Sequence, residues 1–199
     1  MALTRESPPL SSTPLRHRPD RGSRIAAIIL RLIGWRIAGR LPDEPRYVLI
    51  VAPHTSNWDF PVGVVVKFTL GLEATWLGKH TLFRFPVAGL LRWLGGEPID
   101  RTTRHGTTHD AIQRFRERAE WILVISPEGT RKRVAEWKTG FHRIAHGAGV
   151  PIVPVSFDWS TRTITLMDPF ITSDDCDADV RTLRGLFHAG MALRPAGFG

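Results

Sequence analysis

The stretch RYVLIVAPHTSNWDFPVGVVVKFTL, residues 46–70, joins two apolar patterns through a short polar segment. Its opening part, RYVLIVA, is the short apolar run with aromatic and β-branched residues that is typical of a buried strand. The part that starts at Phe60 is long enough for a helix in spite of its β-branched residues. Between the two lie His54 and Asp59. A strand that leads through a polar loop into a helix predicts one unit of an α/β fold.

The same alternation of strand and helix patterns continues along the chain. The clearest helix is THDAIQRFRERAE at 108–120, in which Ile112, Phe115 and Ala119 share one face. Repeated alternation of this kind favours a mostly parallel central sheet flanked by helices. We therefore predict a single α/β domain over residues 42–199. Further strands are expected at ATWLGK (74–79), EPID (97–100), WILVIS (121–126), VPIVPVSFDW (150–159) and RTITLM (162–167).

The amino-terminal part of the chain has a different composition. Residues 1–23 combine prolines, serines and arginines and predict a flexible basic tail. Residues 24–41, RIAAIILRLIGWRIAGRL, repeat apolar residues at helical spacing between arginines, but their uncharged run is far shorter than the ~20 residues of a membrane span. We predict an amphipathic helix lying in a membrane surface, with Trp35 at the interface. The alternative is a helix that packs on the domain and keeps its arginines in water.

The charge balance and the cysteine content narrow the classes of function. Twenty-seven lysines and arginines against 19 aspartates and glutamates give a net charge of +8, which attracts nucleic acid, anionic lipid or phosphorylated substrates. The single cysteine, Cys176, excludes an internal disulfide and a multi-cysteine zinc site. Its aspartate neighbours disfavour the thiolate, so catalysis by this thiol is not expected. The histidines lack metal-ligand spacing, and no metal site is expected either.

Polar clusters follow three of the expected strands. In open α/β sheets such clusters meet at the carboxyl edge, where active sites lie. His54 and Asp59 can form a pair in which the imidazole takes a proton from an alcohol and the carboxylate fixes its tautomer. The alternative is that Asp59 only caps the following helix and His54 is a loop residue.

The second and third clusters carry cations. In SPEGTRKR, Gly129 permits a tight turn, and backbone amides together with Arg131 can hold a phosphate. Arg101 closes GEPIDR, and Lys79 closes ATWLGK at a neighbouring strand end. Each of these would be an ordinary exposed cation by itself. In a β–α layout they point to one edge of the sheet, which predicts an anion-binding site beside the His–Asp pair.

These motifs together resemble the PlsC-like glycerolipid acyltransferases, the 1-acylglycerol-3-phosphate acyltransferases and their relatives. HTSNWD has the H-x4-D pattern of that family and PEGTR its EGTR pattern, while GEPIDR, VPIVPVS and GKHTLFRFP resemble three further blocks. Order and spacing agree from about Arg46 to Phe157. The chain departs from the family in having Lys132 after EGTR and Ser126 before the PE. Lys132 adds a charge at the proposed phosphate site.

The resemblance implies an O-acyltransferase of membrane lipid biosynthesis. A fatty acyl group would pass from acyl-CoA or acyl-carrier protein to the hydroxyl of a lysophospholipid or another phosphorylated acceptor, with no cofactor. It implies that His54 is the general base and Asp59 its partner. The enzyme would be peripheral or monotopic on the cytoplasmic side of a membrane, with no nucleic acid partner. The residues expected to bind substrate are Lys79, Arg101, Glu128, Gly129, Thr130 and Arg131.

Two other functions remain open from the residues. The same His–Asp pair could act on water and make the protein an acyl-thioester hydrolase. A non-catalytic basic module that binds an anionic membrane or nucleic acid would also explain the net charge. Acyl transfer that depends on an acceptor would distinguish an acyltransferase from a hydrolase. A function that survives substitution of His54 would indicate the non-catalytic module.

Overall fold

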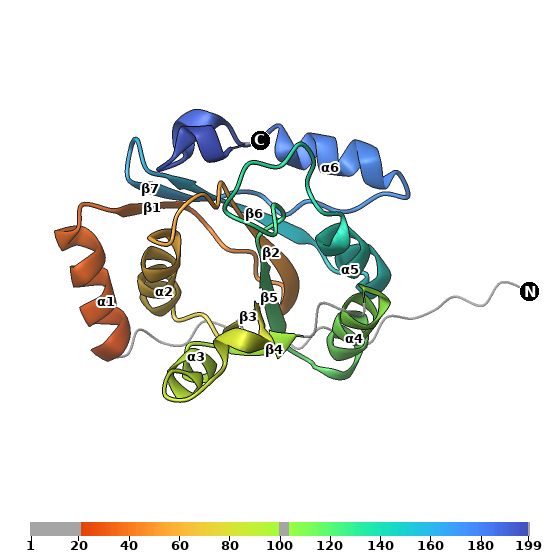
Figure 1. The fold of residues 1–199 in the computed structure, drawn as a ribbon, viewed down its shortest axis with the longest axis horizontal. Helices are drawn as coiled ribbons and strands as arrows, with labels where there is room; N and C mark the ends of the chain where they lie inside the picture. The colour runs from red at the N-terminus through yellow and green to blue at the C-terminus, as the bar shows by residue number, and fades with distance from the viewer. Residues whose placement is uncertain (1–20, 100–103, 199) are drawn as a thin grey trace, which may run out of the picture.

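The computed structural model describes residues 21–99 and 104–198 and shows one sheet between two layers of helices (Figure 1). The seven strands lie in the order β1-β7-β6-β2-β5-β3-β4. From β6 through β2, β5 and β3 to β4 all neighbours are parallel, whereas β7 is antiparallel to β6. This confirms the single, mostly parallel α/β domain. The strands are β1 (Arg36–Gly39), β2 (Arg46–Ala52), β3 (Ala74–Lys79), β4 (Gly96–Ile99), β5 (Trp121–Ile125), β6 (Ile152–Asp158) and β7 (Thr163–Leu166).

The helices divide between the two faces of the sheet. Helices α1 and α2 pack against each other on one side, and α4, α5 and α6 lie on the other (Figure 1). The α-helices are α1 (Arg21–Leu32), α2 (Asp59–Leu70), α3 (Ala88–Trp93), α4 (Arg104–Glu117), α5 (Gly140–Ala148) and α6 (Cys176–Arg184). Short 3-10 turns are η1 (His80–Leu82), η2 (Ala189–Met191) and η3 (Pro195–Gly197).

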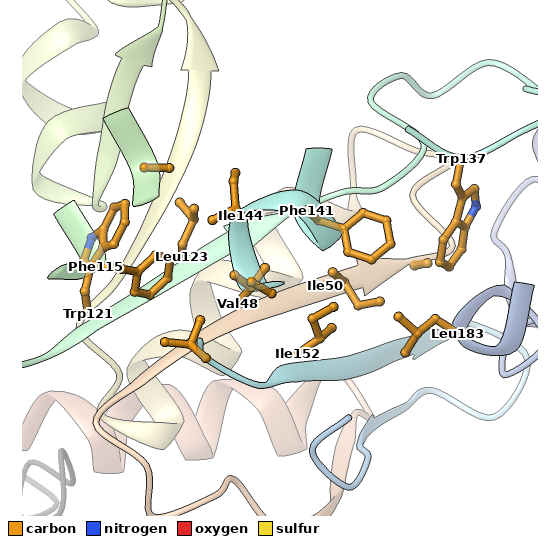
Figure 2. Packing of buried hydrophobic residues seen from close by; sticks show 14 of the residues in the cluster. Val48, Ile50, Phe115, Trp121, Leu123, Trp137, Phe141, Ile144, Ile152 and Leu183 are labelled. Atoms are coloured by element: carbon orange, nitrogen blue, oxygen red, sulfur yellow. The ribbon is translucent and has the colours of Figure 1, made fainter. Parts of the chain in front are cut away.

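The core is split in two by the sheet because successive strand residues point to opposite faces. In β2, Val48 and Ile50 join the cluster under α4, α5 and α6 (Figure 2), whereas Tyr47 and Leu49 join the cluster under α1 and α2. Val48 and Ile50 are fully buried. Burial on both faces explains why RYVLIVA has no polar alternation.

The register of the central strands sets the place of the polar loops. Ile50 of β2 lies opposite Ile125 of β5 on one side and Pro154 of β6 on the other. Strand β5 thus ends opposite Ile50, two residues before the end of β2 at Ala52, and the chain leaves both strands at one edge of the sheet. The loops after them are the segments that contain His54 and the EGTR sequence.

The predicted helix over residues 24–41 is wrong in its second half. Helix α1 ends at Leu32, and Gly34 takes a left-handed φ of 78°, which few residues other than glycine adopt readily. Trp35 then turns inward, is only 5% exposed and packs edge-on against Trp159 with ring centroids 4.9 Å apart. Trp35 is thus a core residue and not an interfacial one. Residues 36–39 form β1 because β7 offers them an edge to pair with.

Other boundaries also differ from the sequence expectations. Residues 21–23 belong to the first turn of α1, and the rest of the predicted tail lies outside the described residues. Between β3 and β4 the chain forms only η1 and the short helix α3, and the last α-helix, α6, ends at Arg184. These differences leave the position of the polar loops unchanged.

Candidate active site

His54 and Asp59 meet at the carboxyl end of β2. The Nδ1 atom of His54 lies 3.2 Å from Oδ2 of Asp59. The His54 side chain is 27% exposed and the Asp59 side chain 1%. Asp59 is the first residue of α2, where the positive end of the helix dipole favours a carboxylate. Because Nδ1 faces the carboxylate, Nε2 is the nitrogen that His54 can offer to a ligand.

Two further hydrogen bonds fix the Asp59 carboxylate. The backbone N–H of Ser56 donates to Oδ2 and the indole N–H of Trp159 donates to Oδ1, both at 2.8 Å. The residue before the helix is Trp58, which makes no side-chain capping bond. Asp59 is therefore held as a partner of the imidazole and is not the cap of α2. In this position the carboxylate can stabilise the imidazolium that forms when Nε2 of His54 takes up a proton.

Glu128 lies behind His54. Its Oε2 accepts hydrogen bonds from the backbone N–H of His54 at 2.8 Å and from the hydroxyl of Ser126 at 3.2 Å. The residue is only 2% exposed, and Oε1 has no hydrogen-bond partner among the described residues. Burial raises the pKa of Glu128, and the hydrogen bond from His54 N–H opposes that rise. Glu128 therefore links the loop after β5, to which it belongs, to the loop after β2, which contains His54.

The rest of the EGTR turn faces a large cavity. Gly129 adopts a left-handed φ of 65°, and a Cβ at this position would come within 2.9 Å of the Lys138 side chain. The turn brings Thr130 and the exposed Arg131 to the wall of the cavity, and Lys79 reaches the same wall from the end of β3. Lys79, Gly129, Thr130 and Arg131 are thus brought together with His54. Arg101 lies outside the described residues.

This cavity, which we call the α2 cavity, has a volume of about 930 Å³ and extends from His54 along α2 and the sheet. Its wall is polar around His54, Asp59 and the cations, and largely apolar elsewhere. Lys138, which the sequence did not single out, adds another ammonium group to the polar part. Apolar residues of the wall include Leu49, Val66, Leu70, Leu77, Val155 and Phe157.

The Cys176 thiol is not part of this arrangement. It begins α6 and does not line the α2 cavity. Burial and the neighbouring Asp177 raise its pKa, as its acidic surroundings predicted, although Arg143 opposes the shift. A thiol with a raised pKa is a poor nucleophile at neutral pH.

The fold and this site define an α/β protein with a His–Asp pair and a group of cations at the carboxyl edge of its sheet. The chain belongs to the Acyltransferase family, which matches residues 37–158, more than half of its length. The crystal structure of the 1-acyl-sn-glycerophosphate (LPA) acyltransferase PlsC from Thermotoga maritima has the same fold. Its TM-score is 0.55 at 19% identity, with 82% of this chain and 77% of that chain covered.

Two curated relatives extend the comparison. The 1-acyl-sn-glycerol-3-phosphate acyltransferase of Escherichia coli K12 is 32% identical over 145 residues, which are 68% of this chain and 58% of that protein. The protein of the same description from Haemophilus influenzae is 28% identical over 187 residues, 83% of this chain and 76% of its own. The matched part of the chain thus spans a little over half of the E. coli relative.

Proposed function

We propose that this protein transfers a fatty acyl group from acyl-CoA or acyl-carrier protein to the hydroxyl of a lysophospholipid of the 1-acylglycerol-3-phosphate kind. The observation that carries the proposal is the His54–Asp59 pair in the wall of a large, mostly apolar cavity that Arg131 and Lys79 also line. The descriptions of the E. coli and H. influenzae relatives support the same acceptor.

The proposed reaction needs no enzyme nucleophile. Nε2 of His54 takes the proton of the acceptor hydroxyl while that oxygen attacks the thioester carbonyl carbon. The C–S bond then breaks, an ester forms, and the departing thiolate receives the proton back from Nε2. Asp59 holds the imidazole in the required tautomer and stabilises the imidazolium between the two transfers. A thioester is activated enough for this direct attack once the two substrates are held together.

The cations and the apolar wall of the α2 cavity would bind different parts of the acceptor. Arg131 and Lys79, with the Thr130 hydroxyl, hold the phosphate of the acceptor, and Arg101 is proposed to join them. Arginine suits this role because its guanidinium can donate two parallel hydrogen bonds to phosphate oxygens. The apolar wall under α2 accommodates a hydrocarbon chain. Glu128 acts through the backbone of His54 and Gly129 through the shape of the turn.

We also propose that the protein docks on an anionic membrane from its cytoplasmic side. No described helix is both long enough and apolar enough to cross a bilayer. Helix α1 and residues 80–93 flank α2 (Figure 1). Both segments expose large apolar side chains and contain no acidic residue. Basic residues beside apolar ones fit a surface of anionic lipid. The exposed apolar residues are Ile25, Ile28, Ile29, Leu32, Leu82, Phe85, Val87, Leu90 and Trp93.

The test is a substrate panel with purified protein and acyl-CoA. CoA release is measured with 1-acylglycerol 3-phosphate, with other lysolipids, with glycerol 3-phosphate and without any acceptor. The proposal expects release that depends on the acceptor and yields the acylated lipid. Steady release in the absence of an acceptor would identify a thioester hydrolase instead. No release with any acceptor, on vesicles that bind the protein, would favour a non-catalytic membrane-binding module.

A further inference from the structure

A second hollow, which we call the basic pocket, lies next to the α2 cavity. It has a volume of about 440 Å³ and shares Asn57 and Arg131 with the wall of the larger cavity. Its other polar lining residues are Thr55, Ser56, Lys132 and Arg194. The pocket is therefore built by the loop after β2, the EGTR turn and the carboxyl-terminal segment together.

The carboxyl-terminal segment is held in place against the site. The backbone N–H of Arg194 donates to Oγ1 of Thr55 at 3.3 Å. Gly197 lies so close that a Cβ on it would be 3.3 Å from the Thr55 side chain and 3.4 Å from the carbonyl oxygen of Arg131. The backbone N–H of Trp159, the residue after β6, donates to the carbonyl of Met191 at 2.8 Å, so the segment is also attached next to the end of β6. These contacts hold the backbone of Arg194 in place beside the pocket.

The charge of the pocket points to an anionic ligand. Arg131, Lys132 and Arg194 all line it, and no carboxylate of residues 21–99 or 104–198 does. Three cations that face one hollow repel one another, and a bound anion relieves that repulsion. The hydroxyl of Thr55 and the amide of Asn57 are neutral and can donate or accept hydrogen bonds. A phosphate group matches this set in charge and in its number of acceptor oxygens.

We propose that the basic pocket binds a phosphate group of one of the two substrates and that Arg194 and Lys132 are substrate-binding residues. The inference rests on the proposed acyl transfer, since that reaction brings two phosphate-bearing molecules to His54. Asn57 and Arg131 connect the pocket to the α2 cavity, so one molecule can place its phosphate in the pocket and its reacting group at His54. The phosphate belongs either to the acceptor headgroup or to the CoA part of the donor.

A binding experiment tests the pocket without any acyl transfer. Wild-type protein, Arg194→Gln and Lys132→Gln are titrated separately with glycerol 3-phosphate and with CoA, followed by two-dimensional ¹⁵N NMR, which detects weak as well as tight binding. Arg181→Gln is the matched control because Arg181 is exposed on α6 and lies outside the pocket. We expect the amide signals of Asn57 and Arg194 to shift in the wild type. Affinity should fall about tenfold in the two pocket variants, the loss of one charge-assisted hydrogen bond.

The two ligands identify the source of the phosphate. A loss of affinity for glycerol 3-phosphate alone assigns the pocket to the acceptor, and a loss for CoA alone assigns it to the donor. The proposal is overturned if Arg181→Gln weakens binding as much as Arg194→Gln, or if neither ligand shifts the Asn57 and Arg194 signals. Failure of acyl transfer in the wild type, with binding intact, would overturn the proposed function and leave the pocket standing.

Discussion

The buried carboxylate of Glu128 accepts a hydrogen bond from the backbone N–H of His54 at 2.8 Å. This contact joins the loop after β2 to the loop after β5, two segments that are 74 residues apart in the chain. It places the His54 backbone before any substrate arrives. Together with the Asp59 carboxylate on Nδ1, it leaves the imidazole little freedom to turn away from the α2 cavity.

The ionisation of Glu128 makes part of the stability depend on pH. Burial raises the pKa of this carboxyl above its ordinary value of 4.5. The folded protein therefore keeps a proton that the unfolded chain releases, and the free energy of unfolding falls as the pH rises from 4.5 through the folded-state pKa. Glu128→Gln removes this effect. Urea unfolding of both proteins between about pH 4 and pH 8 should give curves that diverge. Parallel curves would contradict the raised pKa.

The indole of Trp159 is predicted to stabilise both the fold and the site. Trp159→Phe removes the hydrogen bond to Oδ1 of Asp59 and leaves that buried oxygen without its donor. The free energy of unfolding should fall by about 1–3 kcal/mol. Activity should also fall, because Asp59 can then rotate away from His54. If Trp159→Phe lowers stability but leaves kcat unchanged, the indole is only a structural contact.

The cations on the α2 cavity wall should matter most for phosphorylated acceptors. Arg131→Gln is expected to raise KM for 1-acylglycerol 3-phosphate about tenfold, because one charge-assisted interaction is lost. KM for an acceptor without phosphate, such as a monoacylglycerol, should change little. Lys79→Gln should behave in the same way, because Lys79 lines the same cavity. Equal losses with both acceptors would argue against a phosphate contact.

Membrane docking can be separated from general surface hydrophobicity by three matched variants. Leu32 in α1 and Phe85 after η1 are 80% and 97% exposed, and Ile171, remote from both segments in the chain, is 74% exposed. Leu32→Glu and Phe85→Glu should each weaken binding to vesicles that contain phosphatidylglycerol by about tenfold, the contribution of one buried apolar side chain. Ile171→Glu should bind like the wild type. If all three variants bind alike, these two segments are not the docking surface.

The features that the sequence predicted are those set by local pattern. RYVLIVA has apolar residues on both of its faces and therefore predicted a buried strand, and His54 follows it after Pro53. The EGTR turn follows a second such strand. Since the carboxyl ends of parallel strands meet at one edge of a sheet, the sequence alone predicts that His54 and the EGTR turn lie close together.

The features that the sequence pattern did not predict depend on contacts between residues far apart in the chain. The bond from Trp159 to Asp59 spans 100 residues. Nothing in the pattern around Trp159 distinguishes it from a core tryptophan. Likewise, helical periodicity continues past Leu32, and the change to β1 becomes favourable only because β7 supplies a pairing edge. The contact between Arg194 and Thr55 also joins residues far apart in the chain, so local sequence patterns do not predict it.

The measurement that tests the account most directly is acyl transfer by His54→Ala and Asp59→Asn compared with the wild type. Circular dichroism and thermal unfolding would confirm that the variants are folded. We predict that each substitution lowers kcat by about 10²–10⁴-fold, because the two residues act as one general base. Activity of either folded variant within a few-fold of the wild type would show that the His54–Asp59 pair does not carry the reaction.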